Sequence, residues 1–392
     1  MAADSTCSSL RVVVHQPSLA AYRVAVFREL ARRPGIGLKV LYGDTPGLPN
    51  VEGGGFEARY VPTWRGRLGP LPIQWQPPQW HFAGGGRCDV LVLPWDVHYL
   101  SLFPALARGR VNGIGTVVWG HGFSKRESAL RSVPRRAAAQ LADAALFYTR
   151  GAADRWVGQW RWDPRRVFVA PNSLDQGPIQ AARRHWLDRP GELAEFRRRH
   201  GLEKGPVVLF VARLDAGRRV DLLLEAAVRM RPAYPGLRIV VIGAGPAEDD
   251  LRAQAQRLGL SESVHFAGAI YDEMQLAPWF LSATAMCFPA NIGLSLLHAF
   301  GYGLPVVTSD RRQAHGPEIE ALRDGGNGLL CGDGDAGSLA EALRRIADDP
   351  ALRQRLSGEA LRTVDEQYTL GNMVDGLEAA IRFAAGRVRS AD

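Results

Sequence analysis

Short runs of apolar, mostly β-branched residues alternate along the whole chain with longer segments of helical periodicity. Runs that are continuously apolar, such as VVLFV and IVVIG, predict strands covered on both faces. Strands that alternate with helices predict βαβ units and parallel sheets. The expected strands are 11–15, 38–42, 90–94, 116–119, 144–148 and 167–170 in the first half, and 207–211, 238–242, 264–266, 285–288, 306–308 and 329–331 in the second.

Two successive sets of strands predict an α/β protein with two Rossmann-like, doubly wound domains. The 392 residues suit this division, since single cores usually serve about 100 to 200 residues. A polar segment with Gly177-Pro178 and Pro190-Gly191 marks the boundary. We therefore expect an N-terminal domain over 1–175, a linker over 176–205, a C-terminal domain over 206–365 and a closing segment over 366–392.

The segment 63–82, TWRGRLGPLPIQWQPPQWHF, interrupts the pattern because it is rich in proline and tryptophan. It is expected to be too irregular for a helix or a strand. Long loops of this kind in compact domains often bind ligands.

Composition places the chain among soluble globular proteins, with 46% apolar and 22% charged residues. No apolar run is long enough for a spanning helix, which needs about 18 residues, and the first residues lack a signal-peptide pattern. The four cysteines are scattered without metal-like spacing. These features predict a cytoplasmic protein without disulfides and without an essential metal.

The net charge of +8 suggests a nucleic-acid partner only at first sight. The basic residues are spread along the chain, nearly all are arginine, and no basic tail or zinc-finger motif is present, so we expect no nucleic-acid binding. One local cluster stands out, and it is either a solvated face or a contact with an anionic acceptor or membrane surface. Its members are Lys125, Arg126, Arg131, Arg135 and Arg136.

Ligands of open parallel sheets bind beyond the carboxyl ends of the strands, so the residues there are candidates for a site. Arg213 follows the strand 207–211, and Arg218 comes five residues later. Two guanidinium groups at this place can grip a diphosphate through bidentate hydrogen bonds, although each arginine alone could equally be a surface residue. Gly243, in the GAGP turn after the next strand, is a weaker candidate because a tight turn explains it.

The stretch FPANIGLSLLHAFGYGLPVVTSD, residues 288–310, resembles a phosphate-holding turn that opens a helix. Gly293 is expected to let the backbone pass closely, and a helix that begins near Leu294 would offer the N–H groups of Leu294 and Ser295 to an anion. His298 is the only side chain of this stretch that titrates near neutrality.

In the first half, His121 follows a strand between two glycines, which lets a ligand approach, although a structural histidine fits as well. Asp96 also follows a strand and can accept a hydrogen bond from an acceptor hydroxyl or cap the next helix. Asn172 follows the last strand of the first half, at the expected mouth of a cleft between the domains. The residues expected to bind the acceptor are Tyr22, Trp75, Asp96 and Asn172.

Taken together, these motifs resemble the GT-B glycosyltransferases of the retaining family 4, also called group 1. VARLDAGRRVDLLLEAA resembles the family's G-R-L-x-x-x-K-G-x-D-x-L-L-x-A, with Arg213 and Arg218 at its arginine and lysine. HGPEIEALRDGGNGLL is similar to G-G-x-P-E-I-x-x-x-G-x-N-G-L-L, with Glu318 at the glutamate. GLSLLHAFGYGLPVVTSD and APNSLD also resemble family motifs. The resemblance implies two Rossmann-like domains that face across a cleft, and a last helix that crosses back to the first domain.

Two departures from the family pattern concern the donor site. The paired glutamates E-x7-E fall on Ala290 and His298, and HQPSLAAYR stands where the family has a Gly-Gly loop. A subset of exopolysaccharide transferases is similar in having a histidine at the second position and a W-G-H-G segment. The resemblance implies that His298 binds a ribose hydroxyl.

The implied reaction is sugar transfer with retention, in which the departing diphosphate takes the acceptor proton and no protein nucleophile is required. The protein then supplies positioning and charge stabilisation. The expected catalytic residues are His121, Arg213, Arg218 and Glu318, and the expected donor-binding residues are Gly243, Tyr271, Gly293, Leu294, Ser295 and His298. No cofactor is expected.

The expected function is transfer of a sugar from a nucleotide diphosphate sugar, with uridine or guanosine as the base. The acceptor is either a lipid-linked glycan, which implies peripheral contact with the inner membrane face, or a small natural product that attacks through oxygen, nitrogen or sulfur. The non-enzymatic alternative is a glycosyltransferase-like helper subunit. The loss of both glutamates keeps it open, and the retention of Arg213, Arg218, Gly293 and Glu318 counts against it. An epimerase is disfavoured because it would require carboxylates in the cleft, where the paired glutamates are missing. A phosphorylase is disfavoured because it would require a lysine in the second domain, which has none.

Overall fold

The computed structural model describes residues 9–123 and 129–389 of the chain. Two compact units emerge: the first comprises 1–172 together with 370–392, and the second is Ser173–Thr369. The closing helix, α14 (Leu370–Arg389), thus belongs to the first unit although it follows the second in sequence.

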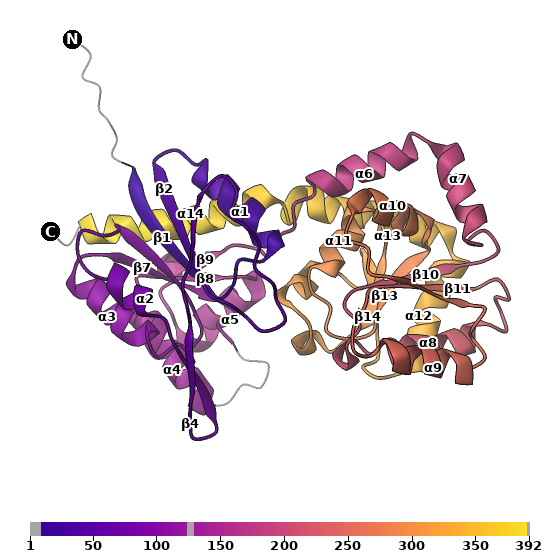
Figure 1. The fold of residues 1–392 in the computed structure, drawn as a ribbon, viewed down its shortest axis with the longest axis horizontal. Coiled ribbons are helices and arrows are strands. Elements are labelled where there is room, and N and C mark those ends of the chain that lie inside the picture. Colours follow the sequence, from indigo (N-terminus) through magenta and orange to yellow (C-terminus); the bar gives the residue numbers. More distant parts are fainter. Residues whose placement is uncertain (1–8, 124–128, 390–392) are drawn as a thin grey trace, which may run out of the picture. The chain divides into compact units, whose positions relative to one another are not determined.

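The first unit is built on a parallel sheet of seven strands in the order β3-β2-β1-β6-β7-β8-β9 (Figure 1). Strands β1, β2, β6, β7 and β8 have mostly buried residues, as the continuous apolar runs predict. The strands are β1 (Leu10–Gln16), β2 (Ile36–Tyr42), β3 (Glu57–Tyr60), β6 (Val90–Pro94), β7 (Gly115–Gly120), β8 (Ala144–Phe147) and β9 (Val167–Val169).

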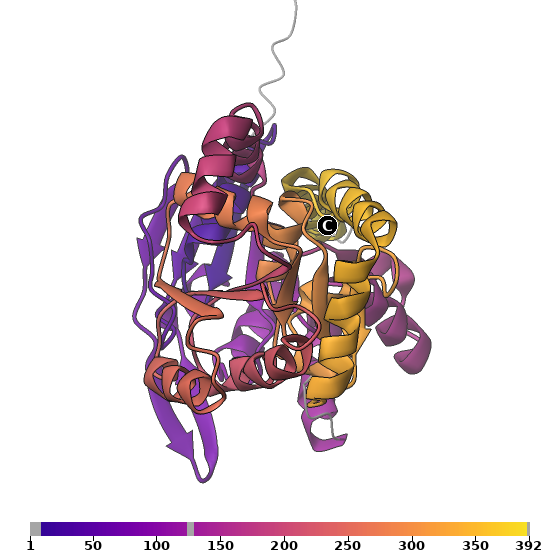
Figure 2. The same ribbon diagram turned by 90° about the vertical axis from the view of Figure 1, so that its right-hand side faces the viewer.

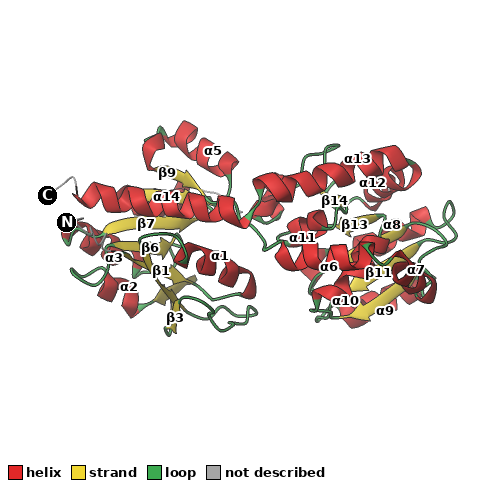
Figure 3. Cartoon of the chain, turned by 90° about the horizontal axis from the view of Figure 1, so that it is seen from above, coloured by secondary structure: helices red, strands yellow, loops and turns green. Residues whose placement is uncertain are grey.

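Helices cover both faces of this sheet (Figure 3). Apolar side chains of α1 and α14 form one core with one face, and those of α3, α4 and α5 form a second core with the other. The helices are α1 (Ala21–Ala31), α2 (Pro77–Phe82), α3 (Leu102–Val111), α4 (Ala129–Leu141), α5 (Arg150–Trp160) and α14.

The segment 63–82 corrects the expectation of an irregular loop. It forms an antiparallel hairpin of β4 (Trp64–Leu68) and β5 (Leu71–Trp75), followed by the short helix α2. Gly69 opens the two-residue turn with a φ of 59°, which glycine adopts without strain. The prolines suggested irregularity, but Pro72 lies in a strand of a two-stranded sheet, where the N–H that proline lacks is not needed.

The second unit has a parallel sheet of six strands in the order β12-β11-β10-β13-β14-β15. All the expected strands of both halves are therefore present, with ends shifted by one or two residues, and the two doubly wound parallel sheets of the predicted GT-B fold class are confirmed. The strands are β10 (Val207–Val211), β11 (Arg238–Ile242), β12 (Val264–Gly268), β13 (Ala285–Phe288), β14 (Val306–Ser309) and β15 (Gly328–Cys331).

Helices α8, α9 and α12 lie on one face of this second sheet, and α6, α10 and α11 lie on the other (Figure 1). The residues expected as a linker, 176–205, include two helices, α6 and α7, that pack on α10 within this unit. The helices are α6 (Gly177–Leu187), α7 (Pro190–Arg199), α8 (Val220–Met230), α9 (Glu248–Arg257), α10 (Glu273–Ser282), α11 (Ser295–Gly301), α12 (Ala336–Asp348) and α13 (Pro350–Arg362).

Candidate functional site

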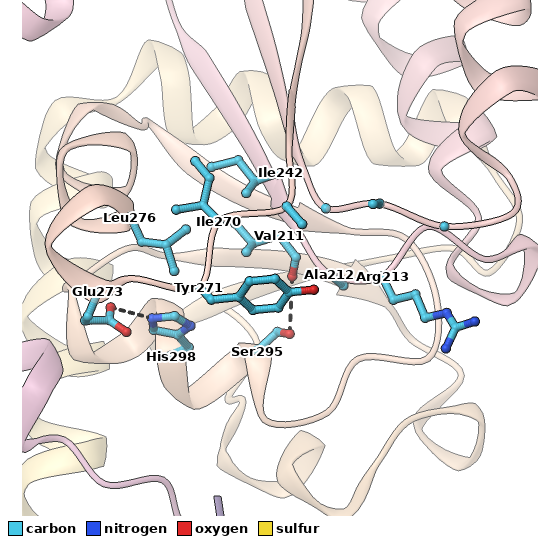
Figure 4. A pocket seen from close by; sticks show the side chains of 14 residues that line it. Val211, Ala212, Arg213, Ile242, Ile270, Tyr271, Glu273, Leu276, Ser295 and His298 are labelled. Atoms are coloured by element: carbon cyan, nitrogen blue, oxygen red, sulfur yellow. Dashed lines mark hydrogen bonds and ion pairs between the residues drawn. The ribbon is translucent and has the colours of Figure 1, made fainter. Parts of the chain in front are cut away.

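A pocket of about 630 Å³ opens at the carboxyl ends of β10, β11 and β12 in the second unit (Figure 4). This volume lies in the range of small-molecule sites, about 300 to 1,000 Å³. Helices α10 and α11 supply its remaining wall. Five of the residues expected from the sequence line it: Arg213, Gly243, Tyr271, Ser295 and His298.

Gly243 forms part of the pocket floor, and its position demands glycine. Its φ is 146°, and a Cβ atom there would lie 1.9 Å from the carbonyl oxygen of Ala212. The absence of a side chain lets the chain after β11 run directly beside the chain after β10, where the Leu214 N–H donates to the Ala244 oxygen at 3.0 Å. The pocket floor is therefore made of closely paired backbone.

Arg213 and Tyr271 present exposed side chains at the pocket. The Tyr271 ring is 92% exposed and extends over the pocket residues, while the Arg213 guanidinium reaches outward from the end of β10 (Figure 4). Ser295 begins α11 and donates its hydroxyl hydrogen to the oxygen of Val211 at 3.4 Å. An exposed ring and an unburied cation are thus available to a ligand in the pocket.

His298 is held in the pocket wall by Glu273, a residue that the sequence analysis did not identify. The His298 Nε2 lies 2.8 Å from Glu273 Oε1, and the hydroxyl of Tyr302 donates to the same oxygen at 2.5 Å. Because an ionised carboxylate only accepts, Nε2 carries the hydrogen, and Nδ1 keeps a lone pair when the ring is neutral. Nδ1 faces away from Glu273 (Figure 4), so in the neutral ring it can accept a hydrogen bond from a ligand.

The electrostatics of this group favour a charged carboxylate next to a neutral phenol. Burial alone raises the pKa of Glu273, but the hydrogen bonds from His298 and Tyr302 and the charge of His298 outweigh it, so the pKa is lowered overall. Burial and the Glu273 carboxylate raise the pKa of Tyr302. Tyr302 therefore remains a hydrogen-bond donor, and its ring stacks on Phe280 at 4.7 Å between centroids.

Arg218 does not line the pocket, and the structure places it against the loop before α11. Its guanidinium donates to the Asn291 carbonyl oxygen and forms an ion pair with Asp215 at 3.3 Å. Asn291 has a left-handed φ of 57°, so this bond holds a bent segment of backbone. Arg218 thus supports the shape of the loop 289–293.

Glu318 lies beside the same loop, in a 3-10 turn (Pro317–Ala321). A Cβ atom on Gly316 would lie 2.4 Å from Glu318 Oε2 and 3.1 Å from the Cα of Gly293, so glycine at 316 lets the turn pack on the loop. A Cβ on Gly293 would meet Glu318 Oε2 at 3.7 Å, an ordinary contact. The expected steric reason for Gly293 is therefore wrong: its lack of a side chain is not needed for close backbone passage.

His315, which the sequence analysis also missed, fixes the loop from behind. Its Nδ1 accepts from the Ile292 N–H at 3.1 Å, and its Nε2 lies 3.0 Å from the Ser309 oxygen. This buried ring therefore links the loop to the end of β14. The helix that follows, α11, begins at Ser295 after Leu294 and has seven residues, so the main-chain N–H groups expected to bind an anion lie at the start of a short helix.

In the first unit, Tyr22 and His121 belong to one cluster of side chains around the buried Arg23. Arg23 is only 6% exposed, and its guanidinium carbon lies 5.2 Å from the Tyr22 ring centroid and 4.8 Å from that of Trp119. It also lies 5.2 Å from the ring of Tyr148, on which the exposed His121 packs at 4.9 Å. The structure thus brings both predicted residues to one aromatic cluster at the carboxyl end of the sheet.

The other three acceptor candidates of the first unit lie elsewhere in it. Asp96 accepts from the backbone N–H of His98 at 3.0 Å, and its Oδ1 lies 2.6 Å from His98 Nδ1. Trp75 ends β5 and faces Trp64 across the hairpin. Asn172 is buried at the end of the unit's first segment.

The predicted basic cluster is described only in part. Lys125 and Arg126 lie outside the described residues, as does the side chain of Arg131. The Arg136 guanidinium lies 4.1 Å from the ring centroid of Trp160, and the Arg135 carbonyl accepts from Trp95 Nε1 at 3.1 Å. Arg136 is thus engaged with an aromatic ring and is not a freely solvated charge.

Within residues 9–123 and 129–389, no helix combines the length and the apolar character needed to cross a bilayer. In the same part of the chain, no three side chains of His, Cys, Asp or Glu lie close enough together to hold a metal ion.

Glu273 and His315 were missed because neither carries a local signal. Glu273 stands in the first turn of α10 behind the capping Asp272, where an acidic residue is favoured by the helix dipole alone. His315 lies 23 residues from Ile292, and their hydrogen bond appears only when the loops meet in space.

Comparisons with known proteins agree with this arrangement. Residues 193–363 match the family described as glycosyl transferases group 1. A D-inositol 3-phosphate glycosyltransferase of Actinosynnema mirum is 31% identical over 247 residues, which cover 60% of this chain and 56% of that protein. LpsE of Rhizobium meliloti, a lipopolysaccharide core biosynthesis glycosyltransferase, is 30% identical over 237 residues, with 59% and 62% covered.

The chain thus spans little more than half the length of the curated relatives it matches. Among solved structures, HepE of Anabaena in complex with UDP aligns with a TM-score of 0.69 at 15% identity, over 95% of this chain and 99% of that one. This likeness supports the fold class, and the family match confirms the resemblance to group 1 enzymes over the matched residues.

Proposed function

We propose that this chain, whose residues 193–363 form a group 1 glycosyl transferase domain, transfers a sugar from a nucleoside diphosphate sugar to an acceptor. The observation that carries the proposal is the pocket at the carboxyl ends of β10, β11 and β12, where open parallel sheets bind ligands. Its lining joins an exposed aromatic ring, an exposed cation and a histidine with a fixed tautomer, which are three groups suited to three parts of a nucleotide.

The diphosphate is assigned to Arg213. Its exposed guanidinium stands at the end of β10, and it can bind two phosphate oxygens at once. Arg218 contributes indirectly, because it holds the loop 289–293 through the carbonyl oxygen of Asn291. Loss of either residue should therefore affect donor binding, but for different physical reasons.

The ribose is assigned to His298 and the base to Tyr271. The Glu273 carboxylate fixes the hydrogen of His298 on Nε2, which leaves Nδ1 to accept from a ribose hydroxyl. In the position where related enzymes have a glutamate, the chain thus supplies an acceptor nitrogen with a carboxylate behind it. The exposed Tyr271 ring can stack on the base.

The proposed reaction proceeds with retention. The acceptor oxygen attacks the anomeric carbon as the bond from that carbon to the diphosphate oxygen breaks, and the acceptor proton passes to the departing diphosphate. Arg213 would stabilise the charge that develops on the diphosphate. Glu318 and His121 are proposed to orient the sugar and the acceptor hydroxyl, respectively, as the family resemblance implies.

For the base, uridine is the first choice and guanosine the second. The solved structures of HepE hold UDP and UDP-glucose, and this chain shares their fold. For the acceptor, the two relatives described above are named for a phosphorylated inositol and for a lipopolysaccharide core. We infer a hydroxyl-rich acceptor, either free or carried by a lipid.

The test is a thermal-shift screen of the full chain against UDP, GDP, ADP and their common sugar conjugates. A ligand at a hundred times its dissociation constant stabilises the folded protein by about 2.7 kcal/mol. A shift with one nucleotide that is lost in Arg213→Ala supports the proposal and names the donor. The absence of any shift would favour a helper subunit that binds no nucleotide sugar.

A further inference from the structure

The hairpin of β4 and β5 extends away from the body of the first unit, as two perpendicular views show (Figures 1 and 2). Its base is fixed: the Gln74 N–H donates to the His98 oxygen at 2.8 Å, and the Leu100 N–H donates to the Gln74 oxygen at 2.8 Å. Near the same end, Arg65 forms an ion pair with Asp44 at 2.8 Å. The hairpin is therefore anchored at its base and projects its tip.

The two faces of the hairpin differ in chemistry. Cross-strand partners share a face, and successive residues alternate between faces. One face is apolar and consists of the pairs Trp64 and Trp75, Gly66 and Ile73, and Leu68 and Leu71. The other face carries Arg65 with Gln74 and Arg67 with Pro72.

The apolar face is exposed at its base and at its tip. Trp64 is 64% exposed, Leu68 is 66% exposed and Leu71 is 59% exposed. Scattered single apolar residues need no explanation on a protein surface, but two leucines opposite each other at the tip of a projecting hairpin form a contiguous patch. Such a patch is typical of an insertion or docking surface.

The charged residues in the sequence around the hairpin are all arginines, although Asp44 from outside this segment pairs with Arg65. No aspartate or glutamate occurs between residues 58 and 88, whereas Arg59, Arg65, Arg67 and Arg87 do. Arg67 is exposed, and in the described part of the chain its guanidinium has no ion-pair or hydrogen-bond partner. A partner that meets this tip must therefore accept cations beside an apolar surface.

A further β-strand from another protein is a poor fit for the β5 edge of the hairpin. Strand addition needs free backbone N–H and C=O groups along an edge. Pro72 in β5 and Pro70 in the turn remove two donors from one edge. The chemistry of the tip matches a lipid surface better, because leucines at the end and an arginine one residue behind fit acyl chains below phosphate headgroups.

We propose that this hairpin docks the protein on an anionic lipid bilayer, with Leu68 and Leu71 inserted at the acyl boundary and Arg67 among the lipid phosphates. Trp64 and Trp75 then lie nearer the water, as aromatic residues do at membrane interfaces. The proposal goes beyond sugar transfer and does not depend on it, since the hairpin belongs to the first unit and the nucleotide pocket to the second.

The experiment is sedimentation of the full chain with vesicles, either of phosphatidylcholine alone or of phosphatidylcholine mixed with phosphatidylglycerol. The wild type should bind the anionic vesicles and bind the neutral ones much more weakly. The double variant Leu68→Ser/Leu71→Ser should lose at least about tenfold in apparent affinity, since each buried methylene contributes to interfacial binding. Arg67→Glu should lose more than about fivefold, and added salt should weaken wild-type binding.

Val111→Ser is the matched control, because Val111 ends α3 with an exposure of 86% and lies outside the hairpin. It should bind vesicles like the wild type. The proposal is overturned if the wild type ignores anionic vesicles, or if the double variant binds as the wild type does. A change of oligomeric state in the double variant, without a change in vesicle binding, would instead assign the patch to a second copy of the chain.

Nucleotide-induced thermal shifts in the same variants keep this test separate from that of the sugar-transfer proposal. Hairpin variants should retain the wild-type shift, which also shows that they are folded. If the chain binds vesicles but no nucleotide, membrane docking is supported and the proposed binding of a nucleotide-sugar donor is contradicted.

Discussion

His298 and Glu273 lie 2.8 Å apart, Nε2 to Oε1, on the wall of the nucleotide-sized pocket. Replacing Glu273 with glutamine keeps the shape but allows either nitrogen of His298 to carry the hydrogen. We expect Glu273→Gln to weaken nucleotide binding by about 1 to 2 kcal/mol, roughly five- to thirtyfold, as measured by calorimetry. Tyr302→Phe is the control, since it removes a donor to Glu273 outside the pocket lining and should have a smaller effect.

The same pair predicts how stability depends on pH. The pKa of Glu273 is lowered in the folded protein, so its contribution to stability is present above the unfolded value, about 4.5, and is lost as pH falls through the folded pKa. The difference in unfolding free energy between the wild type and Glu273→Gln should shrink as pH falls below about 5. A difference that grows on acidification would contradict the assigned charge state.

The two arginines after β10 should separate in their effects. Arg213 is exposed, so Arg213→Ala should leave stability within about 0.5 kcal/mol while nucleotide binding weakens by about 1.5 to 3 kcal/mol. Arg218 holds the Asn291 carbonyl and pairs with Asp215, so Arg218→Ala should also lower stability by about 1 to 2 kcal/mol. Urea unfolding and calorimetry on both variants provide the measurement. Equal loss of stability in the two would show that the loop does not depend on Arg218.

The sequence predicted the strands of the two parallel sheets but not the hairpin. Strands such as Val207–Val211 can be recognised in the sequence, because parallel strands buried on both faces are continuously apolar. The hairpin had a weaker signal: Trp64, Gly66 and Leu68 alternate with arginines, but the neighbouring prolines hid a period of two. Its apolar face lies in solvent, so no core pattern marked it.

Site residues divide in the same way. Arg213 and His298 could be located because each follows a strand end that the pattern fixes. Their surroundings could not, since the bond from Glu273 to His298 spans 25 residues and depends on how α10 and α11 pack. Nothing in the motif around the two arginines distinguishes Arg218, which supports a loop, from Arg213, which faces the pocket.

Gly243 offers a test of the pocket floor. An alanine there would place Cβ 1.9 Å from the Ala212 oxygen at a φ of 146°, so Gly243→Ala should destabilise the protein by more than about 2 kcal/mol and impair nucleotide binding. Gly358→Ala is the matched control in the same unit, because Gly358 lies in α13 with open space where a Cβ would stand. It should be neutral or stabilising by up to about 1 kcal/mol. Similar melting temperatures for both variants would refute the close backbone pairing.

His15 predicts acid sensitivity of the first unit. Its ring is fully buried, and burial lowers its pKa to about 3, which outweighs a weaker opposing effect of the nearby Gln76 side chain. His15 is protonated below about pH 6.5 in the unfolded chain but stays neutral in the folded protein. The contribution of the neutral His15 to stability is therefore present above that pH and is lost as pH falls. Between pH 7.5 and pH 5 the loss should reach about 2 kcal/mol.

In His15→Gln this pH-dependent loss of stability should vanish, so urea unfolding curves of the variant should change less between these two pH values. His81→Gln, at an exposed ring of the same unit, should follow the wild type, and an unchanged pH response in His15→Gln would mean that His15 is charged or solvated in the folded state.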